Sequence, residues 1–189
     1  MARPKSATHD IKRDAILDIA AQCFAKFSYP AASMNEIATA CGTSKARLYH
    51  YYDSKEAILF DLLDRHTQRL LALIAQTEAH AQRKNLDERA TLHALVRAFL
   101  QEYETSATRH AALLNDTQFL SDAPNPDLAA PPVSPRDLIL NRQRDIVAAM
   151  TRFMKRAYPE RLTPANQTAL TMMLLGMICL LYTSDAADE

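Results

Sequence analysis

Basic side chains able to bind nucleic acid gather in one short segment, ACGTSKARLYHYYDSKEAIL, at residues 40–59. The ammonium groups of Lys45 and Lys55 can neutralise backbone phosphates. The guanidinium group of Arg47 can donate two parallel hydrogen bonds to the edge of a guanine. These residue types predict that the segment contacts double-stranded DNA.

Aromatic and hydroxyl side chains in and before this segment suit the same partner. Tyr49, His50 and Tyr51 can donate hydrogen bonds to phosphates or pack on thymine methyl groups. Ser33 stands at the expected start of the preceding helix, where its hydroxyl and nearby unpaired backbone N–H groups form a natural phosphate site. We therefore include these four residues among the candidate DNA contacts.

Two short helices must position these side chains, and the sequence marks their ends. Ser33 and Glu36 predict a capping box at the start of the first helix, and Gly42 ends it after about two turns. The second helix opens at Thr43 or Ser44. Two short helices joined by the tight turn CGTS are the sequence form of a helix-turn-helix. In that motif the second helix lies in the major groove, with its N-terminal residues at base edges.

An ordinary structural interpretation also exists for these residues. A run of tyrosines at helical spacing often packs at the edge of a core, and a single lysine or arginine is usually solvated. We expect Leu48 and Tyr52 to belong to the core. We expect Lys45, Arg47 and Tyr49 to contact DNA, because the capped pair of short helices gives them a specific context.

The whole chain predicts an all-α fold. Among its 189 residues are only 2 glycines, whereas sheet proteins usually use more glycine in turns and bulges. Apolar residues recur at helical spacing in most of the chain. The expected helices span residues 10–27, 33–42, 43–52, 53–76, 86–107, 108–120, 136–157 and 164–178. A capping-box-like pair, Asp53 and Glu56, opens the fourth of them. The proline-rich residues 121–137 predict a loop.

These helices divide the chain into two units and a tail. We expect a three-helix helix-turn-helix domain at residues 8–53 and a larger helical bundle at residues 54–178, apparently truncated at its last helix. The final residues 179–189, CLLYTSDAADE, resemble a translated sequencing adapter. We therefore expect a non-native tail after about Ile178, the alternative being a genuine acidic tail. Without a last interface helix, we expect the chain to dimerise poorly.

An enzyme is a second hypothesis for this chain, and its motifs disfavour it. No H-E-x-x-H, G-x-S-x-G or phosphate-binding loop occurs. His66, His80 and His93 are scattered, and we interpret them as solvated or hydrogen-bonded surface residues. The 3 cysteines have no metal-ligand spacing. We therefore expect no catalytic residue, no metal site and no cofactor.

The ends of the chain bear on its location. The N-terminal stretch MARPKSATHDIKRDAIL lacks the apolar region of a signal peptide. The longest apolar run, LTMMLLGMICLLY, is too short to predict a membrane span. We therefore expect a cytoplasmic protein that does not bind membranes. A third hypothesis is a helical protein-interaction module whose LYHYY segment binds a protein, and salt-dependent binding to DNA would separate it from a regulator.

The segment SMNEIATACGTSKARLYHYYDSKEAIL resembles the N-terminal domain of TetR-family transcriptional regulators. Their pattern has a serine or threonine cap, then IA, G-V-S, LY-x-H/Y-F and SK, and the match covers roughly residues 11–60. By this resemblance Lys45, Ala46 and Arg47 read bases, with Asn35 a weaker candidate. Residues that hold the DNA backbone by the same resemblance are Tyr49, His50, Tyr51 and Lys55. The family usually has glycine at the position of Ser28, which implies mild strain in that turn.

The resemblance also implies how the protein works. It implies a ligand-binding and dimerisation domain at residues 54–178, and a homodimer in which the last two helices of each subunit pack as a four-helix interface. A two-fold dimer would bind a palindromic operator. A small-molecule effector inside the bundle would then release this repressor from DNA.

Five residues of the bundle are candidate effector contacts. Asn115 and Gln118 are polar groups in an otherwise apolar helix and suit the head group of a ligand. Arg142 suits a phosphate, and this region is similar to family members that sense acyl-CoA thioesters. Phe99 and Tyr103 provide apolar walls. The alternatives are that Arg142 is a surface residue, that Asn115 caps a helix, and that Phe99 and Tyr103 are ordinary core residues.

Overall fold

The computed structural model describes residues 7–183 and shows an all-α chain, as the sequence predicts. Within that range the only β-type pairing is an isolated bridge between Asn125 and Val133. The helices are α1 (Ala7–Phe27), α2 (Met34–Ala40), α3 (Lys45–Tyr49), α4 (Lys55–Lys84), α5 (Glu88–Thr105), α6 (Ala107–Asn115), the 3-10 helix η1 (Thr117–Phe119), α7 (Pro135–Ala157) and α8 (Gln167–Thr183).

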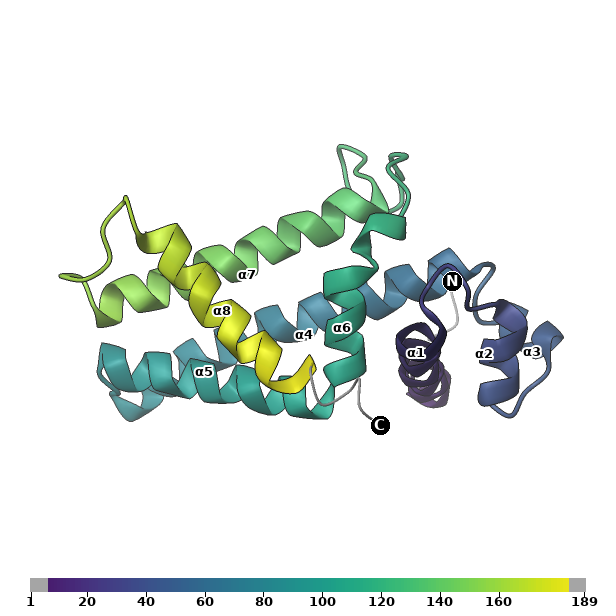
Figure 1. Ribbon diagram of the computed structural model, residues 1–189, viewed down its shortest axis with the longest axis horizontal. Helices are drawn as coiled ribbons and strands as arrows, with labels where there is room; N and C mark the ends of the chain where they lie inside the picture. Colours follow the sequence, from purple (N-terminus) through teal and green to yellow (C-terminus); the bar gives the residue numbers. More distant parts are fainter. Residues whose placement is uncertain (1–6, 184–189) are drawn as a thin grey trace.

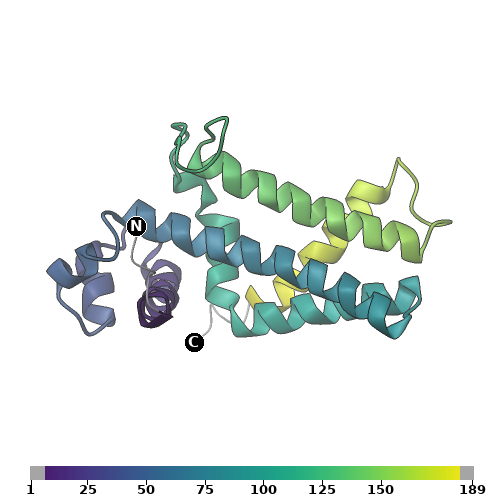
Figure 2. The ribbon, with the colours of Figure 1, turned by 180° about the vertical axis from the view of Figure 1, so that it is seen from behind.

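The helices form a small head and a longer bundle (Figure 1). The head contains α1, α2 and α3, and the bundle contains α5, α7 and α8. Helix α4 starts in the head and continues through the length of the bundle, as the view from behind shows (Figure 2). Helix α6 stands between the bundle and α1. The head is therefore attached to the bundle both by chain continuity and by packing.

Side-chain caps define where the short helices begin. The Ser33 hydroxyl accepts a hydrogen bond from the Glu36 backbone N–H at 3.2 Å, and the Glu36 carboxylate accepts one from the Ser33 N–H at 2.7 Å. This is the predicted capping box. Helix α4 begins differently from the prediction, because Ser54 rather than Asp53 is its N-cap and accepts from the Ala57 N–H at 3.0 Å. The cap lies one residue later than the pattern indicates.

One apolar core joins the head to the bundle. Its fully buried side chains include Leu17 of α1, Leu48 of α3, Leu62 of α4 and Phe153 of α7, all in one contiguous cluster. Helix α4 supplies several of them because its apolar residues recur at helical spacing on more than one face. The division at residues 53 and 54 therefore stays a prediction about domains, within a continuous core.

The last helix differs from the sequence prediction at both ends. We expected a helix over residues 164–178, whereas α8 begins at Gln167 and continues through Thr183. Residues 164–166 instead form a turn. Residues 179–183 of the expected non-native tail continue α8, and residues 184–189 lie outside the described residues. Within residues 7–183 no helix is long and apolar enough to cross a membrane.

Candidate functional site

Helix α3 presents the side chains that the sequence singles out for DNA. Leu48 is completely buried and fixes the helix to the head. Lys45, Ala46 and Arg47 are exposed, and Tyr49 keeps 43% of its surface exposed. The helix therefore offers a basic and aromatic face while its single leucine anchors it.

The turn between α2 and α3 is built from backbone and hydroxyl groups. Gly42 has a φ of 61°, a conformation that glycine adopts without a steric cost. The Thr43 N–H donates to the Ala38 carbonyl at 2.9 Å. The Ser44 hydroxyl then accepts from the Arg47 N–H at 3.2 Å and starts the second helix. These contacts set the angle at which Lys45 and Arg47 leave the turn.

A polar network holds the end of α3 against the rest of the head. The Tyr52 hydroxyl donates to the Asp61 carboxylate at 2.6 Å, and Arg13 forms an ion pair with the same carboxylate at 2.8 Å. Arg65 contacts its other oxygen at 3.0 Å. Burial opposes ionisation, but the hydrogen bonds from Tyr52 and Arg65 lower the pKa of Asp61. Tyr52, only 3% exposed, is thus a core residue as expected.

Lys55 has a different place from the phosphate contact that we expected. Its ammonium donates to the backbone carbonyls of Tyr29 at 2.6 Å, Pro30 at 3.2 Å and Ala32 at 2.7 Å. It also lies 4.4 Å from the centroid of the Tyr29 ring. An ammonium has three N–H donors, and all three have partners here. Lys55 therefore holds the loop before α2.

That loop contains the strain expected at Ser28. Ser28 has a φ of 63°, which is uncommon for a residue with a side chain. The loop leads directly to Ser33, whose cap at the start of α2 is exposed. Lys55 thus compensates for a strained turn and positions Ser33.

The remaining candidates of the head divide by exposure. Asn35 and His50 are exposed. Tyr51 is half-buried and stacks on His9, with the ring centroids 5.1 Å apart. The structure therefore leaves Ser33, Asn35 and His50 accessible to a DNA backbone, whereas Tyr51 has only part of its ring available.

A second site lies in the bundle, as an apolar cavity of about 530 Å³. Helices α4, α5, α6, α7 and α8 all contribute to its wall. The residues that line it are Leu70, Tyr103, His110, Leu113, Leu114, Gln143, Ile146, Val147, Met172, Leu175, Gly176 and Cys179. None of these residues carries a permanent charge. The cavity has the size and apolar character of a small-molecule site.

Of the five predicted effector contacts, the structure brings one to this cavity. Tyr103 lines it, and Phe99 packs behind Tyr103 with a centroid separation of 5.8 Å. Asn115 and Gln118 are exposed and do not line it. Arg142 forms an ion pair with Asp64 of α4. The expected head-group and phosphate contacts therefore lie outside the cavity.

Two histidines beside the cavity are buried, which the sequence analysis did not predict. His66, expected on the surface, is 1% exposed, and its Nε2 lies 3.3 Å from Nδ1 of His110. His110 also stacks on Tyr103 at a centroid distance of 3.8 Å. Burial lowers the pKa of His66 to about 3 and that of His110 to about 4. The signal for His66 is its spacing of four residues from both Leu62 and Leu70, on the buried stripe of α4.

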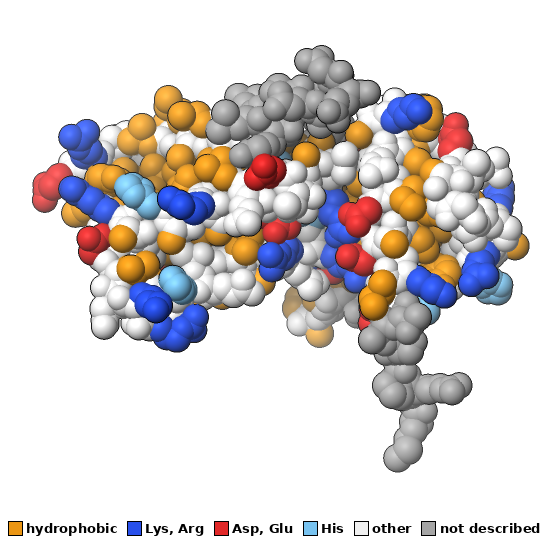
Figure 3. Space-filling view, turned by 90° about the horizontal axis from the view of Figure 1, so that it is seen from below, with side chains coloured by type: hydrophobic (Ala, Val, Ile, Leu, Met, Phe, Trp, Pro, Cys, Tyr) orange, Lys and Arg blue, Asp and Glu red, His pale blue; other side chains and the backbone are white. Residues whose placement is uncertain are grey.

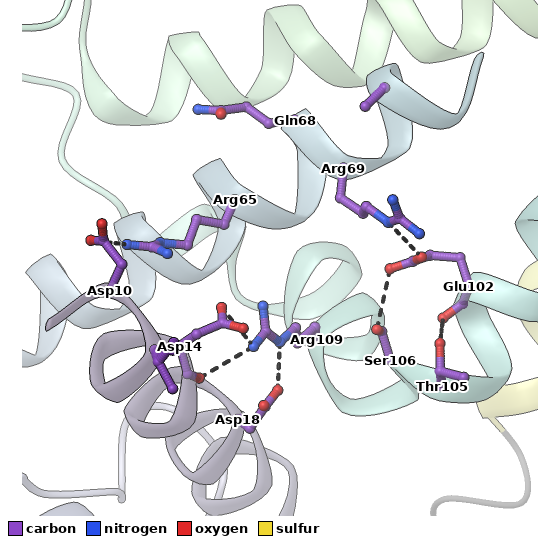
Figure 4. A pocket seen from close by; sticks show the side chains of 12 residues that line it. Asp10, Asp14, Asp18, Arg65, Gln68, Arg69, Glu102, Thr105, Ser106 and Arg109 are labelled. Carbon is purple, nitrogen blue, oxygen red and sulfur yellow. Dashed lines mark hydrogen bonds and ion pairs between the residues drawn. The ribbon is translucent and has the colours of Figure 1, made fainter. Parts of the chain in front are cut away.

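A charged groove of about 770 Å³ lies between α1 and the helices α4, α5 and α6. In Figure 4, Arg109 of α6 reaches across it to α1, with ion pairs of 3.1 Å to Asp14 and 2.6 Å to Asp18. Figure 3 shows acidic and basic side chains side by side between the two ends of the molecule. Arg69 and Glu102 form a further ion pair at 2.9 Å between α4 and α5.

Two more contacts connect the segment after α6 with the head. The Phe119 ring stacks on Tyr29 at a centroid distance of 5.0 Å. The Ser121 N–H donates to the Glu56 carboxylate at 2.7 Å. A displacement of η1 would therefore alter contacts with both the loop after α1 and the start of α4.

The structure thus has a helix-turn-helix head that a long helix, α4, joins to an all-α bundle with an apolar cavity. Residues 16–62 match the family model described as bacterial regulatory proteins, tetR family. The crystal structure of a TetR-family transcriptional regulator from Bordetella parapertussis 12822 is 31% identical, with a TM-score of 0.78, over 90% of this chain and 82% of that one. The chain belongs to the TetR family.

Two curated relatives are similar over about half of this chain. The HTH-type transcriptional repressor KstR2 of Rhodococcus jostii (strain RHA1) is 35% identical over 102 residues, which are 54% of this chain and 47% of that protein. The HTH-type transcriptional activator FasR of Mycolicibacterium smegmatis (strain ATCC 700084 / mc(2)155) is 36% identical over 95 residues, 50% of this chain and 42% of its own. The chain thus spans about half the length of these curated relatives.

Proposed function

We propose that this protein is a transcriptional repressor that binds a palindromic DNA operator as a homodimer and is released by a small-molecule effector. The observation that carries the proposal is the exposed face of α3, with Lys45, Arg47 and Tyr49 outward and Leu48 buried. This arrangement suits insertion into a major groove. The similarity to the repressor KstR2 supports the direction of regulation, and the activator FasR makes that direction a matter for direct measurement.

Helix α6 supports the proposed link between effector and DNA. Arg109 ties it to Asp14 and Asp18 of α1, while the next residue, His110, and then Leu113 line the cavity. An effector that pushes on α6 would therefore change the position of α1 within the head. Because a ligand acts only through a difference in affinity between two states, the two positions of α6 must differ in how they fit the effector.

An exposed apolar stripe on α8 supports the proposed dimer. Met172, Met173 and Met177 are 53%, 62% and 63% exposed. Neighbouring apolar side chains of this kind mark protein contact surfaces. We propose that α8 packs against its two-fold copy in the homodimer.

Selection of binding sites from a random DNA library tests the DNA-binding proposal. The expected result is a palindromic consensus, with an affinity that falls steeply as salt concentration rises. Arg152→Ala on the exposed surface of α7 is a matched control for Arg47→Ala in the reading helix. Failure to enrich any sequence, together with salt-independent retention of DNA, would overturn the proposal.

A helical protein-interaction module without DNA binding remains the second candidate. The observation in its favour is the aromatic character of the LYHYY segment, of which Tyr49 is exposed. A protein partner that competes with selected DNA for this face would support it. We further propose that the protein acts in the cytoplasm and is not an enzyme, in keeping with a family of regulators.

A further inference from the structure

The side chain of Gln143 gives the bundle cavity a defined polarity. Its Nε2 lies 3.4 Å from the carbonyl oxygen of Leu113 at the end of α6. A carbonyl can only accept a hydrogen bond, so the amide must turn its N–H group toward Leu113 and its oxygen away. The same carbonyl also accepts from the Thr117 hydroxyl at 2.7 Å, which occupies its second lone pair. The orientation of the Gln143 amide is therefore determined by its partner.

The amide oxygen of Gln143 is the accepting group left over at the cavity wall. It has no hydrogen-bond partner among the described residues. The oxygen is not completely buried, because the one fully buried side-chain N or O atom without a partner among the described residues is His9 Nδ1. Gln143 lines the cavity. A molecule in the cavity can therefore donate a hydrogen bond to this oxygen.

The other polar side chains described in the wall are engaged with one another, and the Tyr103 hydroxyl is hydrogen-bonded to Cys179. His110 contacts His66 through one ring nitrogen and Cys179 through the other, at 3.3 and 3.0 Å. Burial keeps His110 neutral, because it lowers the pKa to about 4. Within residues 7–183 no lysine or arginine lines the cavity. An anion placed here would lose its hydration without gaining a cation or a free donor.

We infer that the effector of the proposed regulator is an uncharged, largely apolar molecule with one hydrogen-bond donor, such as a hydroxyl group, that binds the Gln143 oxygen. This inference rests on the proposed function for the role of the ligand, and on the cavity alone for its chemistry. It differs from the acyl-CoA expectation, because the cavity wall holds no partner for phosphates. Arg142, the expected partner, is paired with Asp64 instead.

Isothermal titration calorimetry of the full chain with probes of equal chain length tests the inference. The probes are 1-octanol, methyl octyl ether, octanoate, octylamine and octanoyl-CoA. We expect 1-octanol to bind about fivefold more tightly than the ether, which lacks the donor. We expect octanoate and octanoyl-CoA to bind at least about tenfold more weakly than 1-octanol. Tighter binding of octanoate or octanoyl-CoA than of 1-octanol overturns the inference.

Variants at position 143 separate the role of the oxygen from general packing. Gln143→Leu should weaken 1-octanol by about fivefold and leave the ether unchanged. Gln143→Glu keeps the size and adds a negative charge, so octylamine should become the preferred probe. Gln76→Leu on the exposed face of α4 is the matched control and should leave every affinity unchanged. Equal binding of 1-octanol by the parent and both position-143 variants contradicts the inference.

The two proposals fail in different ways. If the chain binds a selected operator but prefers octanoate or octanoyl-CoA, the inferred ligand class is wrong and the regulator stands. If it binds 1-octanol as expected but no DNA, the cavity chemistry stands and the proposed function falls. Circular dichroism of each variant at the titration temperature verifies that the compared proteins are folded.

Discussion

Adjacent side chains on α3 have opposite environments, and this contrast makes their roles separable. Arg47 is exposed, whereas Leu48 has no exposed surface. Arg47→Ala should relax sequence preference at one base pair by about 1–3 kcal/mol while leaving the thermal midpoint unchanged. Lys45→Ala should weaken binding to all sequences alike if its ammonium contacts a phosphate, and should relax the preference at one base pair if Lys45 reads a base, as the family resemblance implies. Affinities for the selected operator and for single-base variants, measured at several salt concentrations, distinguish the two effects.

The family resemblance implies that Lys55 holds the DNA backbone, whereas in the structure its ammonium binds loop carbonyls. Replacement by methionine keeps the apolar stem and removes the three hydrogen bonds to the loop carbonyls. Lys55→Met should lower the free energy of unfolding by about 1–3 kcal/mol, because the carbonyls lose their charged donor. Urea denaturation measures this change, with Lys84→Met at the exposed end of α4 as the control.

The salt dependence of DNA binding then tells which role Lys55 has. A residue that only positions the loop leaves the slope of log affinity against log salt unchanged. A drop of about one in that slope would show that the ammonium leaves the carbonyls and contacts a phosphate instead.

At the scale of helices, the pair His66 and His110 between α4 and α6 makes stability depend on pH. Both have pKa values lowered by burial, to about 3 and about 4, so both stay neutral in the folded protein. The unfolded histidines take up protons below about pH 6.5. Their contribution is therefore present above that pH and is lost as pH falls toward 4.

Asp116 acts with the opposite sign in the same window. Its burial raises the pKa to about 6, so the folded protein holds a proton there that the unfolded chain has released. The net difference is about one proton, so the free energy of unfolding should decrease by about 1–1.5 kcal/mol per pH unit as pH falls from about 6 to about 5. Urea unfolding at several pH values measures it. His66→Gln should flatten this slope whatever it does to stability at neutral pH, whereas His93→Gln on the exposed side of α5 should not.

The same elements show what sequence could and could not predict. Ser33 and Glu36 revealed their capping box because both partners lie within one turn of the same helix. The partners of Lys55 and Arg142 in the structure, at Tyr29 and Asp64, could not be predicted because they are distant along the chain. A charged side chain has many possible partners, and only tertiary packing selects one. His66 was the avoidable error, since its helical spacing from Leu62 and Leu70 indicated burial.

At the scale of the whole molecule, the exposed methionines of α8 predict self-association, in contrast to the expectation from the sequence that this chain dimerises poorly. Met173→Glu places a charge on the proposed apolar contact and should shift the monomer–dimer equilibrium toward monomer by at least about tenfold. Met173→Leu keeps the apolar surface and should leave the equilibrium constant nearly unchanged. Sedimentation equilibrium of the parent and both variants measures it, and a Glu variant that associates as well as the parent would place the interface elsewhere.

Helix α4 connects the head with the bundle cavity, and its length has a mechanical consequence. With 30 residues it runs from the head to the far end of the bundle, and at about 1.5 Å per residue its axis measures about 45 Å. As a lever arm of that length, it converts a tilt of about 5° at its far end into a displacement of about 4 Å at the head, close to the rise of one base pair. In the proposed dimer, the distance between two labels on the two heads should therefore change far more on effector binding than the distance between two labels beside the cavities.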